Sequence, residues 1–189
     1  MPRAGLTPQR LVEAAAELAD SAGLDHVTIS ALARGFGVKD ASLYSHIRSL
    51  DDLRARLAVH AAAEFADRLG SALAGRSGQA ALTAFADAYR AYAVSHPGRY
   101  AAVQLRLPAA VLAGSPGHAK LVEYTYALMR SYDLAEPDLT DAVRLLRSTF
   151  HGFAALEAAD GFAAARPVQE SWTRGIAALH DLLTRWPTA

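Results

Sequence analysis

The sequence predicts an all-α protein, and three observations carry that prediction. The chain has 189 residues, of which 52% are hydrophobic, so it is long enough to bury a substantial core. It contains 43 alanines against 13 glycines and 8 prolines, and alanine has the highest intrinsic helix propensity. Apolar residues recur at helical spacing between Gly and Pro breaks. About nine helices are expected, in one large domain or two small ones.

The first expected helix, over residues 8–21, has a capping signal at each end. Thr7 is the N-cap and Pro8 occupies the first helical position, where its missing N–H costs nothing. The apolar stripe begins at Leu11, and Gly23 follows as a C-cap. A second, two-turn helix starts after Thr28 or Ser30 and ends at the 35–37 turn.

The third expected helix follows Val38 and is again short. Leu43 and Ile47 lie on one face, and Lys39, Ser42 and His46 share the opposite face. Ser49 then caps a longer helix that runs to about residue 73 and has two aspartates in its first turn. A loop is expected at 75–78, and further helices at 79–95, 97–107, 118–132, 138–162 and 168–185.

Composition excludes several classes of protein. The absence of Cys excludes disulfide frameworks, thiolate nucleophiles and Cys-containing zinc sites, and it suits the reducing cytoplasm, where we expect the protein to reside. No signal peptide or membrane span is expected, since the most apolar stretch, 101–113, is interrupted by Arg106 and Pro108. With 19 basic and 19 acidic residues, any nucleic-acid role requires a local patch.

Two short helices joined by a Gly-containing turn, behind a longer supporting helix, have the outline of a helix-turn-helix unit. Buried apolar residues would fix the angle between the two helices, and Lys39 would then point outward from the second. The core expected for this unit is Ile29, Leu32, Phe36, Val38, Leu43 and Ile47. The second helix of such a unit enters the DNA major groove.

The side chains of that helix suit base and phosphate contacts. Lys39 can donate to a guanine edge or a phosphate, Ser42 can donate or accept, and Ala41 can contact a thymine methyl. The full set of expected DNA-binding residues is Thr28, Ser30, Arg34, Lys39, Asp40, Ala41, Ser42, Tyr44, Ser45, His46 and Arg48. Three alternatives stay open: a solvated helix face for Lys39, Ser42 and His46, a core position for Tyr44, and plain capping for Thr28.

The segments 27–38 (VTISALARGFGV) and 42–47 (SLYSHI), followed by Leu53, resemble the DNA-binding domain of the TetR family of transcriptional regulators. A weaker likeness to one branch of TetR C-terminal domains lies at 96–100 (HPGRY) and 150–153 (FHGF). The resemblance implies a helix-turn-helix domain over 1–50, extending into the fourth helix to about 67, and a helical ligand-binding and dimerisation domain over 51–189. It also implies a repressor that a small molecule releases from a palindromic operator.

The sequence departs from the family pattern at two positions. Lys39 stands where a small polar cap is common, and Leu50 stands where a lysine is common. Residues 1–60 hold seven Arg or Lys and seven Asp or Glu, so the DNA-binding segment has no net charge. We therefore expect few phosphate contacts per subunit and a weak dependence of DNA affinity on salt.

The larger domain offers candidates for an effector pocket and for a dimer interface. Aromatic and other large side chains in the central helices could line a cavity, although each alone is more often a core residue: Phe85, Tyr89, Tyr100, Tyr124, Met129, Phe150 and His151. The family pairs its last two helices with those of a second copy, which suggests an interface at Leu146, Phe153, Leu156, Trp172, Ile176, Leu179 and Leu183.

Other function classes have weaker support. The seven histidines show no metal-ligand spacing, and the chain has no nucleophile elbow or Gly-rich phosphate loop, so we expect no enzyme activity, metal or cofactor. The alternative hypothesis is a helical protein-protein interaction module without specific DNA binding, since amphipathic helices alone would also suit that role. The helix-turn-helix spacing and the Leu43-Tyr44 pair favour the DNA-binding hypothesis.

Overall fold

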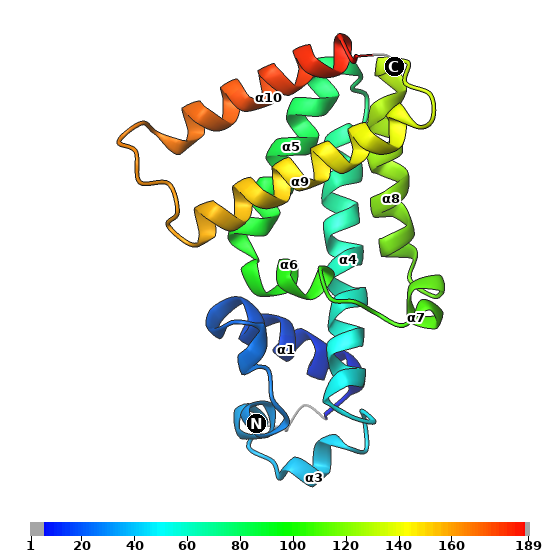
Figure 1. Ribbon diagram of the computed structural model, residues 1–189. Helices are drawn as coiled ribbons and strands as arrows, with labels where there is room; N and C mark the ends of the chain where they lie inside the picture. The colour runs from blue at the N-terminus through cyan, green and yellow to red at the C-terminus, as the bar shows by residue number, and fades with distance from the viewer. Residues whose placement is uncertain (1–5, 188–189) are drawn as a thin grey trace. The chain divides into compact units, whose positions relative to one another are not determined.

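The computed structural model describes residues 6–187, and within them all regular secondary structure is helical (Figure 1). The α-helices are α1 (Pro8–Ala22), α2 (Ile29–Phe36), α3 (Asp40–Leu43), α4 (Leu50–Leu73), α5 (Gly78–Ser95), α6 (Pro97–Val103), α7 (Ala109–Ala113), α8 (Pro116–Met129), α9 (Asp138–Ala158) and α10 (Val168–Thr184), with 3₁₀ turns at Leu24–His26 and Arg130–Tyr132. The all-α prediction is confirmed, and none of the helices described is long and apolar enough to cross a membrane.

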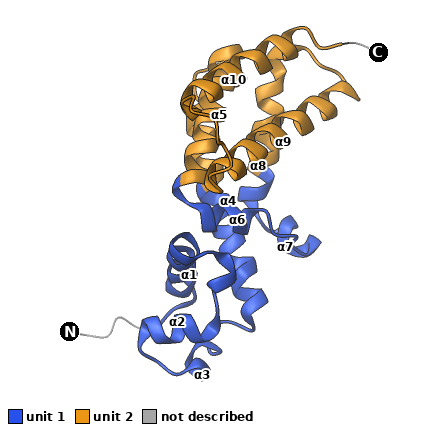
Figure 2. Ribbon diagram, turned by 60° about the vertical axis from the view of Figure 1, so that its left-hand side comes forward, with its two compact units in different colours: residues 1–64, 95–119 blue, residues 65–94, 120–189 orange. Residues whose placement is uncertain are grey.

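The chain divides into two compact units (Figure 2). Unit 1 consists of Met1–Glu64 and Ser95–Ala119, described from residue 6 onward, and unit 2 consists of Phe65–Val94 and Lys120–Ala189, described as far as residue 187. The sequence suggested one boundary near residue 50. Instead α6, α7 and the start of α8 belong to the same unit as the helix-turn-helix segment.

Unit 1 has a core of aliphatic and alanine side chains, with its helix ends fixed by caps. The Thr7 hydroxyl accepts a hydrogen bond from the backbone N–H of Arg10, and Gly23 ends α1 with φ 98°. Leu11, Ala15 and Leu57 are fully buried in the core that these helices share.

Two glycines let helices of unit 1 approach each other at backbone distance. A Cβ added to Gly98 in α6 would lie 2.0 Å from the carbonyl carbon of Ala19 in α1, and one added to Gly117 in α8 would lie 2.5 Å from the backbone nitrogen of Ala63 in α4. Next to Gly98, the backbone N–H of Arg99 donates to the Asp20 carboxylate at 2.8 Å. Backbone groups therefore set the distance between these helices, with no side chain in between.

Unit 2 has a core of aromatic rings. Phe150 of α9 lies at its centre, with ring centroids 6.3 Å from Phe85, 5.5 Å from Tyr89 and 5.9 Å from Trp172. Phe65 stacks on Tyr92 at 4.6 Å. Helices α4, α5, α9 and α10 all contribute to this cluster, so large side chains set their separation.

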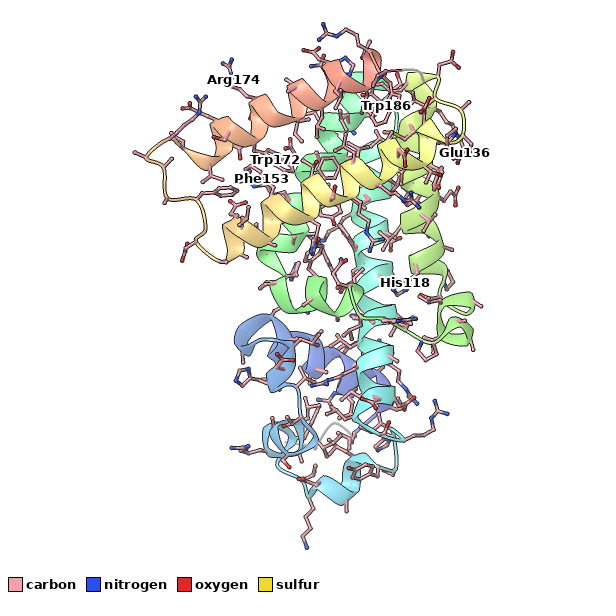
Figure 3. All side chains as sticks on the ribbon, in the orientation of Figure 1. His118, Glu136, Phe153, Trp172, Arg174 and Trp186 are labelled. Carbon is pink, nitrogen blue, oxygen red and sulfur yellow. The ribbon has the colours of Figure 1, made fainter. Side chains whose placement is uncertain are left out.

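An ion pair ties α5 to α9 and α10. The Arg90 guanidinium donates from Nε and Nη2 to the Glu157 carboxylate, both at 2.6 Å, and from Nη1 to Gln169 at 2.6 Å. Its cation also lies over the rings of Phe153 and Trp172, which Figure 3 shows side by side. The Trp172 indole N–H donates to Asp87 at 2.7 Å.

Several helix boundaries differ from the sequence expectation. Helix α6 ends at Val103 rather than 107, and Leu107 itself is disfavoured in the helical conformation because it precedes Pro108. The five-residue α7 was not predicted. Helix α9 ends at Ala158 rather than 162, and the chain reverses at Asp160 with φ 51°. Helix α3 comprises only residues 40–43, and a turn covers 44–46.

Candidate nucleic-acid interface

The turn between α2 and α3 is fixed by hydrogen bonds at both ends of α2. At its start the Thr28 hydroxyl accepts from the backbone N–H of Ala31 at 3.2 Å. At its end Gly37 adopts the left-handed conformation, φ 66°, and the Val38 N–H donates to the Ala33 carbonyl at 2.9 Å. Gly37 is thus a left-handed glycine C-cap, which ends α2 and lets the chain turn into α3.

Helix α3 is anchored from one side only. Leu43 and Ile47 are 0% and 2% exposed in the unit 1 core. On the outer side Lys39, Ala41, Ser42 and Tyr44 are exposed, and we call these four residues the reading face. Within residues 6–187, the side chains of Lys39, Ser42 and Tyr44 have no hydrogen bond or ion pair. Their donors and acceptors are therefore available to another molecule.

A side-chain hydrogen bond links the two helices of the motif. The Ser30 hydroxyl in α2 donates to the Asp40 carboxylate at the start of α3, with 2.5 Å between the oxygens. Asp40 also lies in the first turn of α3, where its negative charge interacts favourably with the positive end of the helix dipole. The sequence marked both residues as DNA-binding candidates, but their spacing of ten positions gave no sign of this contact.

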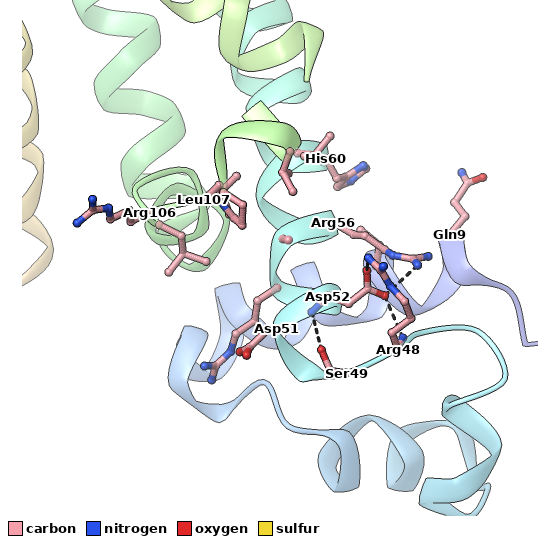
Figure 4. Close-up of a pocket in the computed structure, with 16 residues that line it drawn as sticks. Gln9, Arg48, Ser49, Asp51, Asp52, Arg56, His60, Arg106 and Leu107 are labelled. Carbon is pink, nitrogen blue, oxygen red and sulfur yellow. Dashed lines mark hydrogen bonds and ion pairs between the residues drawn. The ribbon is translucent and has the colours of Figure 1, made fainter. Parts of the chain in front are cut away.

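A charged cluster lies at the start of α4 (Figure 4). The Ser49 hydroxyl accepts from the Asp52 N–H at 3.1 Å, which confirms the predicted cap. The Asp52 carboxylate pairs with Arg48 and Arg56, each at 2.9 Å. Burial raises the pKa of Asp52, but hydrogen bonds from the backbone and side chain of Arg48 and from Arg56 outweigh it and lower the pKa from 3.8 to about 2.

Arg48 is the member of this cluster that faces solvent, with 86% of its side chain exposed. Because one carboxylate is shared by two guanidinium groups, the cluster keeps a positive charge beside the reading face. The sequence analysis missed Asp52 and Arg56 as its partners, although the spacing 48, 52 and 56 is the i, i+4 pattern that places side chains together on a helix.

The structure brings the predicted DNA-binding residues to one region of unit 1. Ten of the eleven are exposed, and His46 is half-buried: Thr28, Ser30, Arg34, Lys39, Asp40, Ala41, Ser42, Tyr44, Ser45, His46 and Arg48. Tyr44 is 54% exposed, so it is not a core residue. One expectation was wrong: Val38, expected in the core, is 39% exposed, because the turn after Gly37 carries it out to the surface.

Four of the seven expected effector residues are core residues of unit 2. Phe85, Tyr89, Met129 and Phe150 are 1–7% exposed, and the three rings pack on one another in the core of unit 2. His151 is exposed, Tyr124 is half-buried, and Tyr100 belongs to unit 1. Neither of the two cavities described, one in each unit, is lined by any of the seven. The four side chains buried in unit 2 contribute to its core, and effector binding by the seven residues stays a prediction.

The expected interface residues are also mostly internal. Leu146, Trp172, Ile176, Leu179 and Leu183 are at most 9% exposed because they pack within their own chain. Phe153 is half-buried against Trp172, and Leu156 is 50% exposed. The apolar stripes on α9 and α10 thus mark the face turned into unit 2. The interface role of these residues stays a prediction.

Comparison with protein families matches both parts of the chain. Residues 11–57 match the model described as bacterial regulatory proteins, tetR family, and residues 82–179 match the model described as tetracyclin repressor-like, C-terminal domain. An uncharacterised HTH-type transcriptional regulator of Bacillus subtilis, YobS, is 34% identical over 179 residues, covering 90% of this chain and 88% of YobS.

Solved structures share the fold over nearly the whole chain. A protein of unknown function from Rhodococcus sp. RHA1 is 25% identical with a TM-score of 0.76, covering 96% of this chain and 97% of that one. BioQ, solved with its double-stranded DNA operator, is 20% identical with a TM-score of 0.67, covering 96% of this chain and 99% of its own. The last comparison establishes similarity of fold.

Proposed function

Since the chain belongs to the TetR family of transcriptional regulators, and is a regulator rather than an enzyme, we propose that it binds a palindromic DNA operator as a homodimer. In this proposal it represses nearby genes until a small molecule releases it. The observation that carries the proposal is the reading face, whose polar side chains are exposed and unbonded while Leu43 and Ile47 hold the backbone beneath them in the core.

The reading face supplies each kind of contact that DNA recognition needs. Lys39 offers an ammonium to guanine or phosphate, Ser42 a hydroxyl to base or phosphate, and Ala41 a methyl to thymine. Tyr44, at 54% exposure, is free to donate its hydroxyl to a phosphate. Arg48 adds an exposed positive charge next to them.

Substitution of the reading face tests this assignment. Lys39→Ala and Ser42→Ala should each weaken operator binding by about 1–3 kcal/mol without changing the fold. Lys120→Ala is the matched control, because Lys120 is the chain's other lysine and its side chain is 47% exposed. Equal operator affinity for all three variants and the wild type would show that the reading face is assigned wrongly.

We propose that the homodimer interface is formed by the outward sides of α9 and α10. On α10 an exposed stripe runs through Ser171, Gly175, Ala178 and Leu182, one face of the helix. A Cβ added at Gly175, or at Gly152 on α9, would meet nothing within 4 Å in its own chain. Small residues facing outward allow the close approach of a second helix, and two-fold DNA half-sites require a two-fold protein.

Charge placed on this surface should break the dimer. Leu156→Asp and Leu182→Asp put carboxylates at positions that are 50% and 42% exposed in one chain. Analytical ultracentrifugation should show monomers at concentrations where the wild type is dimeric. Leu112→Asp is the control, since Leu112 is 41% exposed in unit 1. Dimers of unchanged stability in both test variants would place the interface elsewhere.

A gel-shift titration tests DNA recognition itself. The purified protein is titrated against the DNA that flanks its own gene, in the presence of excess unrelated DNA. We expect a shift that resists the competitor and saturates at two subunits per site. If neither this DNA nor random DNA at low salt is bound, the interaction-module hypothesis is favoured instead.

Release by a small molecule requires that the molecule binds one conformation better than the other. Its effect on DNA affinity is limited to the difference in its affinity for the two states. The same gel shift, with candidate compounds added, measures that difference directly as a change in apparent operator affinity.

A further inference from the structure

Unit 1 contains a cavity of about 890 Å³ that the DNA-binding role does not explain (Figure 4). It is bounded by α1, by α4 and by residues 105–111, which comprise most of the segment that links α6 to α7 and the start of α7. Ligand pockets commonly enclose about 300–1,000 Å³, so a small organic molecule would fit.

One part of the cavity wall is apolar. Val59 on α4, Leu105 and Leu107 on the linking segment, and Val111 on α7 are all only half-buried, and Val12 of α1 lies at the base. Half-buried aliphatic side chains that converge on one space leave apolar surface in contact with water. An apolar ligand body would remove that surface from water.

The polar part of the wall carries excess positive charge. Four arginines line the cavity, at positions 48, 54, 56 and 106, against Asp51 and Asp52. Asp52 already bonds to two of the arginines, and the low pKa of its carboxyl keeps it charged and paired with them. Two positive charges are therefore left in excess among these six groups, and the wall favours an anion.

Arg54 contributes charge to this wall. Its Nε atom is buried and has no hydrogen-bond acceptor within the described residues, and because water cannot touch that atom, a ligand in the cavity cannot bond to it either.

We propose that this cavity binds an amphipathic organic anion, a carboxylate attached to an apolar body. The apolar body would lie against Val59, Leu107 and Val111. The carboxylate would lie at the arginines, among which Arg106 is exposed and has no hydrogen bond or ion pair of its side chain within residues 6–187. The proposal does not depend on DNA binding, so it can fail while the regulatory function holds, and the reverse is also true.

The test compares two probes of equal length that differ in charge, octanoate and 1-octanol. Both are titrated into the full-length protein by calorimetry, and ¹H–¹⁵N NMR locates the perturbed amides. We expect octanoate to bind about tenfold more tightly than 1-octanol, the effect of one charge-assisted hydrogen bond. The perturbed amides should lie in α1, in α4 and at 105–111.

Two variants separate the charge from the apolar wall. Arg106→Met removes a guanidinium from the cavity wall but keeps an unbranched apolar side chain, and it should weaken the preference for octanoate while 1-octanol still binds. Val111→Glu puts a carboxylate in the apolar wall, on the short helix α7, and should abolish octanoate binding. Val122→Glu is its control, because Val122 is 60% exposed on α8 in unit 2.

Three results would overturn the proposal. These are equal affinities for octanoate and 1-octanol, perturbed amides confined to unit 2, and unchanged octanoate affinity in Val111→Glu relative to Val122→Glu.

Discussion

Helices pack closely through small residues in unit 1 and are separated by large aromatic side chains in unit 2. In unit 1, Gly98 and Gly117 bring helix backbones into direct contact, among small alanine and aliphatic side chains. In unit 2, the rings of Phe65, Phe150 and Trp172 hold the helices apart and fill the space between them. Unit 1 is thus intolerant of added volume, and unit 2 is intolerant of lost volume.

Both tryptophans of the chain, Trp172 and Trp186, lie in unit 2. Tryptophan fluorescence therefore reports on unit 2 alone, whereas far-ultraviolet circular dichroism reports on the helices of both units. Urea unfolding followed by both signals, at fixed protein concentration, can assign each substitution to the unit that it destabilises.

Loss of volume in unit 2 should have the largest effect. Phe150→Ala removes the ring that contacts Phe85, Tyr89 and Trp172, and should destabilise the protein by about 3–5 kcal/mol. The fluorescence transition should move to lower urea at least as far as the circular dichroism transition. A loss below about 1 kcal/mol would mean that the ring cluster relaxes freely, and the contrast between the units would fail.

Added volume in unit 1 should cause the second largest loss of stability. Gly98→Ala places a Cβ 2.0 Å from the α1 backbone, so α1 and α6 must separate, at a cost of about 3 kcal/mol. Gly35→Ala is the matched control in α2, where a Cβ meets nothing within 4 Å. That variant should be more stable than wild type by about 0.5–1 kcal/mol, because alanine has the higher helix propensity.

The Arg90 ion pair tests whether unit 2 also depends on charge. Arg90→Met keeps much of the volume but leaves the Glu157 carboxylate, 22% exposed, without its bidentate partner. We expect a loss of about 2 kcal/mol, less than for a fully buried pair. The double variant Arg90→Met/Glu157→Gln should recover part of it, and a double variant no more stable than the single would indicate that Arg90 acts through its stacking on Phe153 and Trp172.

The smallest expected effect is the pH dependence of the free energy of unfolding that Asp52 of unit 1 produces. Because the native pKa of Asp52 is about 2, below its ordinary 3.8, the folded state holds fewer protons than the unfolded state between those values. Its contribution, about 1–2 kcal/mol, is complete above pH 4 and is lost as the pH falls toward 2. The stability difference between wild type and Asp52→Asn should therefore shrink between pH 6 and pH 3. A stability difference between the two proteins that stays constant over this pH range would exclude ionisation of Asp52 as the source of the difference.

Local signals made the part of unit 1 from α1 to the start of α4 largely predictable from sequence. The caps Thr7, Thr28 and Ser49 and the glycine at 37 act within four residues of themselves, and each was placed correctly. The exposed reading face followed from the same spacing. Contacts between the helices of the motif could not be predicted in this way. The Ser30–Asp40 hydrogen bond depends on the packing of α3 against α2, and no local sequence pattern encodes that packing.

The sequence did not separate core residues from functional residues in unit 2, and the reason is physical. An aromatic stripe at helical spacing shows that a face is buried, but the same stripe suits a core, a cavity or an interface. Burial within one chain shows that Phe150 and Trp172 are core residues. The partners of Arg90 lie 67 and 79 positions away, and pairs so distant are set only by the tertiary fold.

The shortness of α3 has a consequence for the thermodynamics of recognition. A helix of four residues does not persist on its own, since nucleation alone outweighs its few hydrogen bonds. Its order comes from Leu43 and Ile47 in the core and from the Ser30–Asp40 bond. The conformational entropy of the reading helix is therefore lost once, during folding, and association with DNA need not immobilise that backbone again.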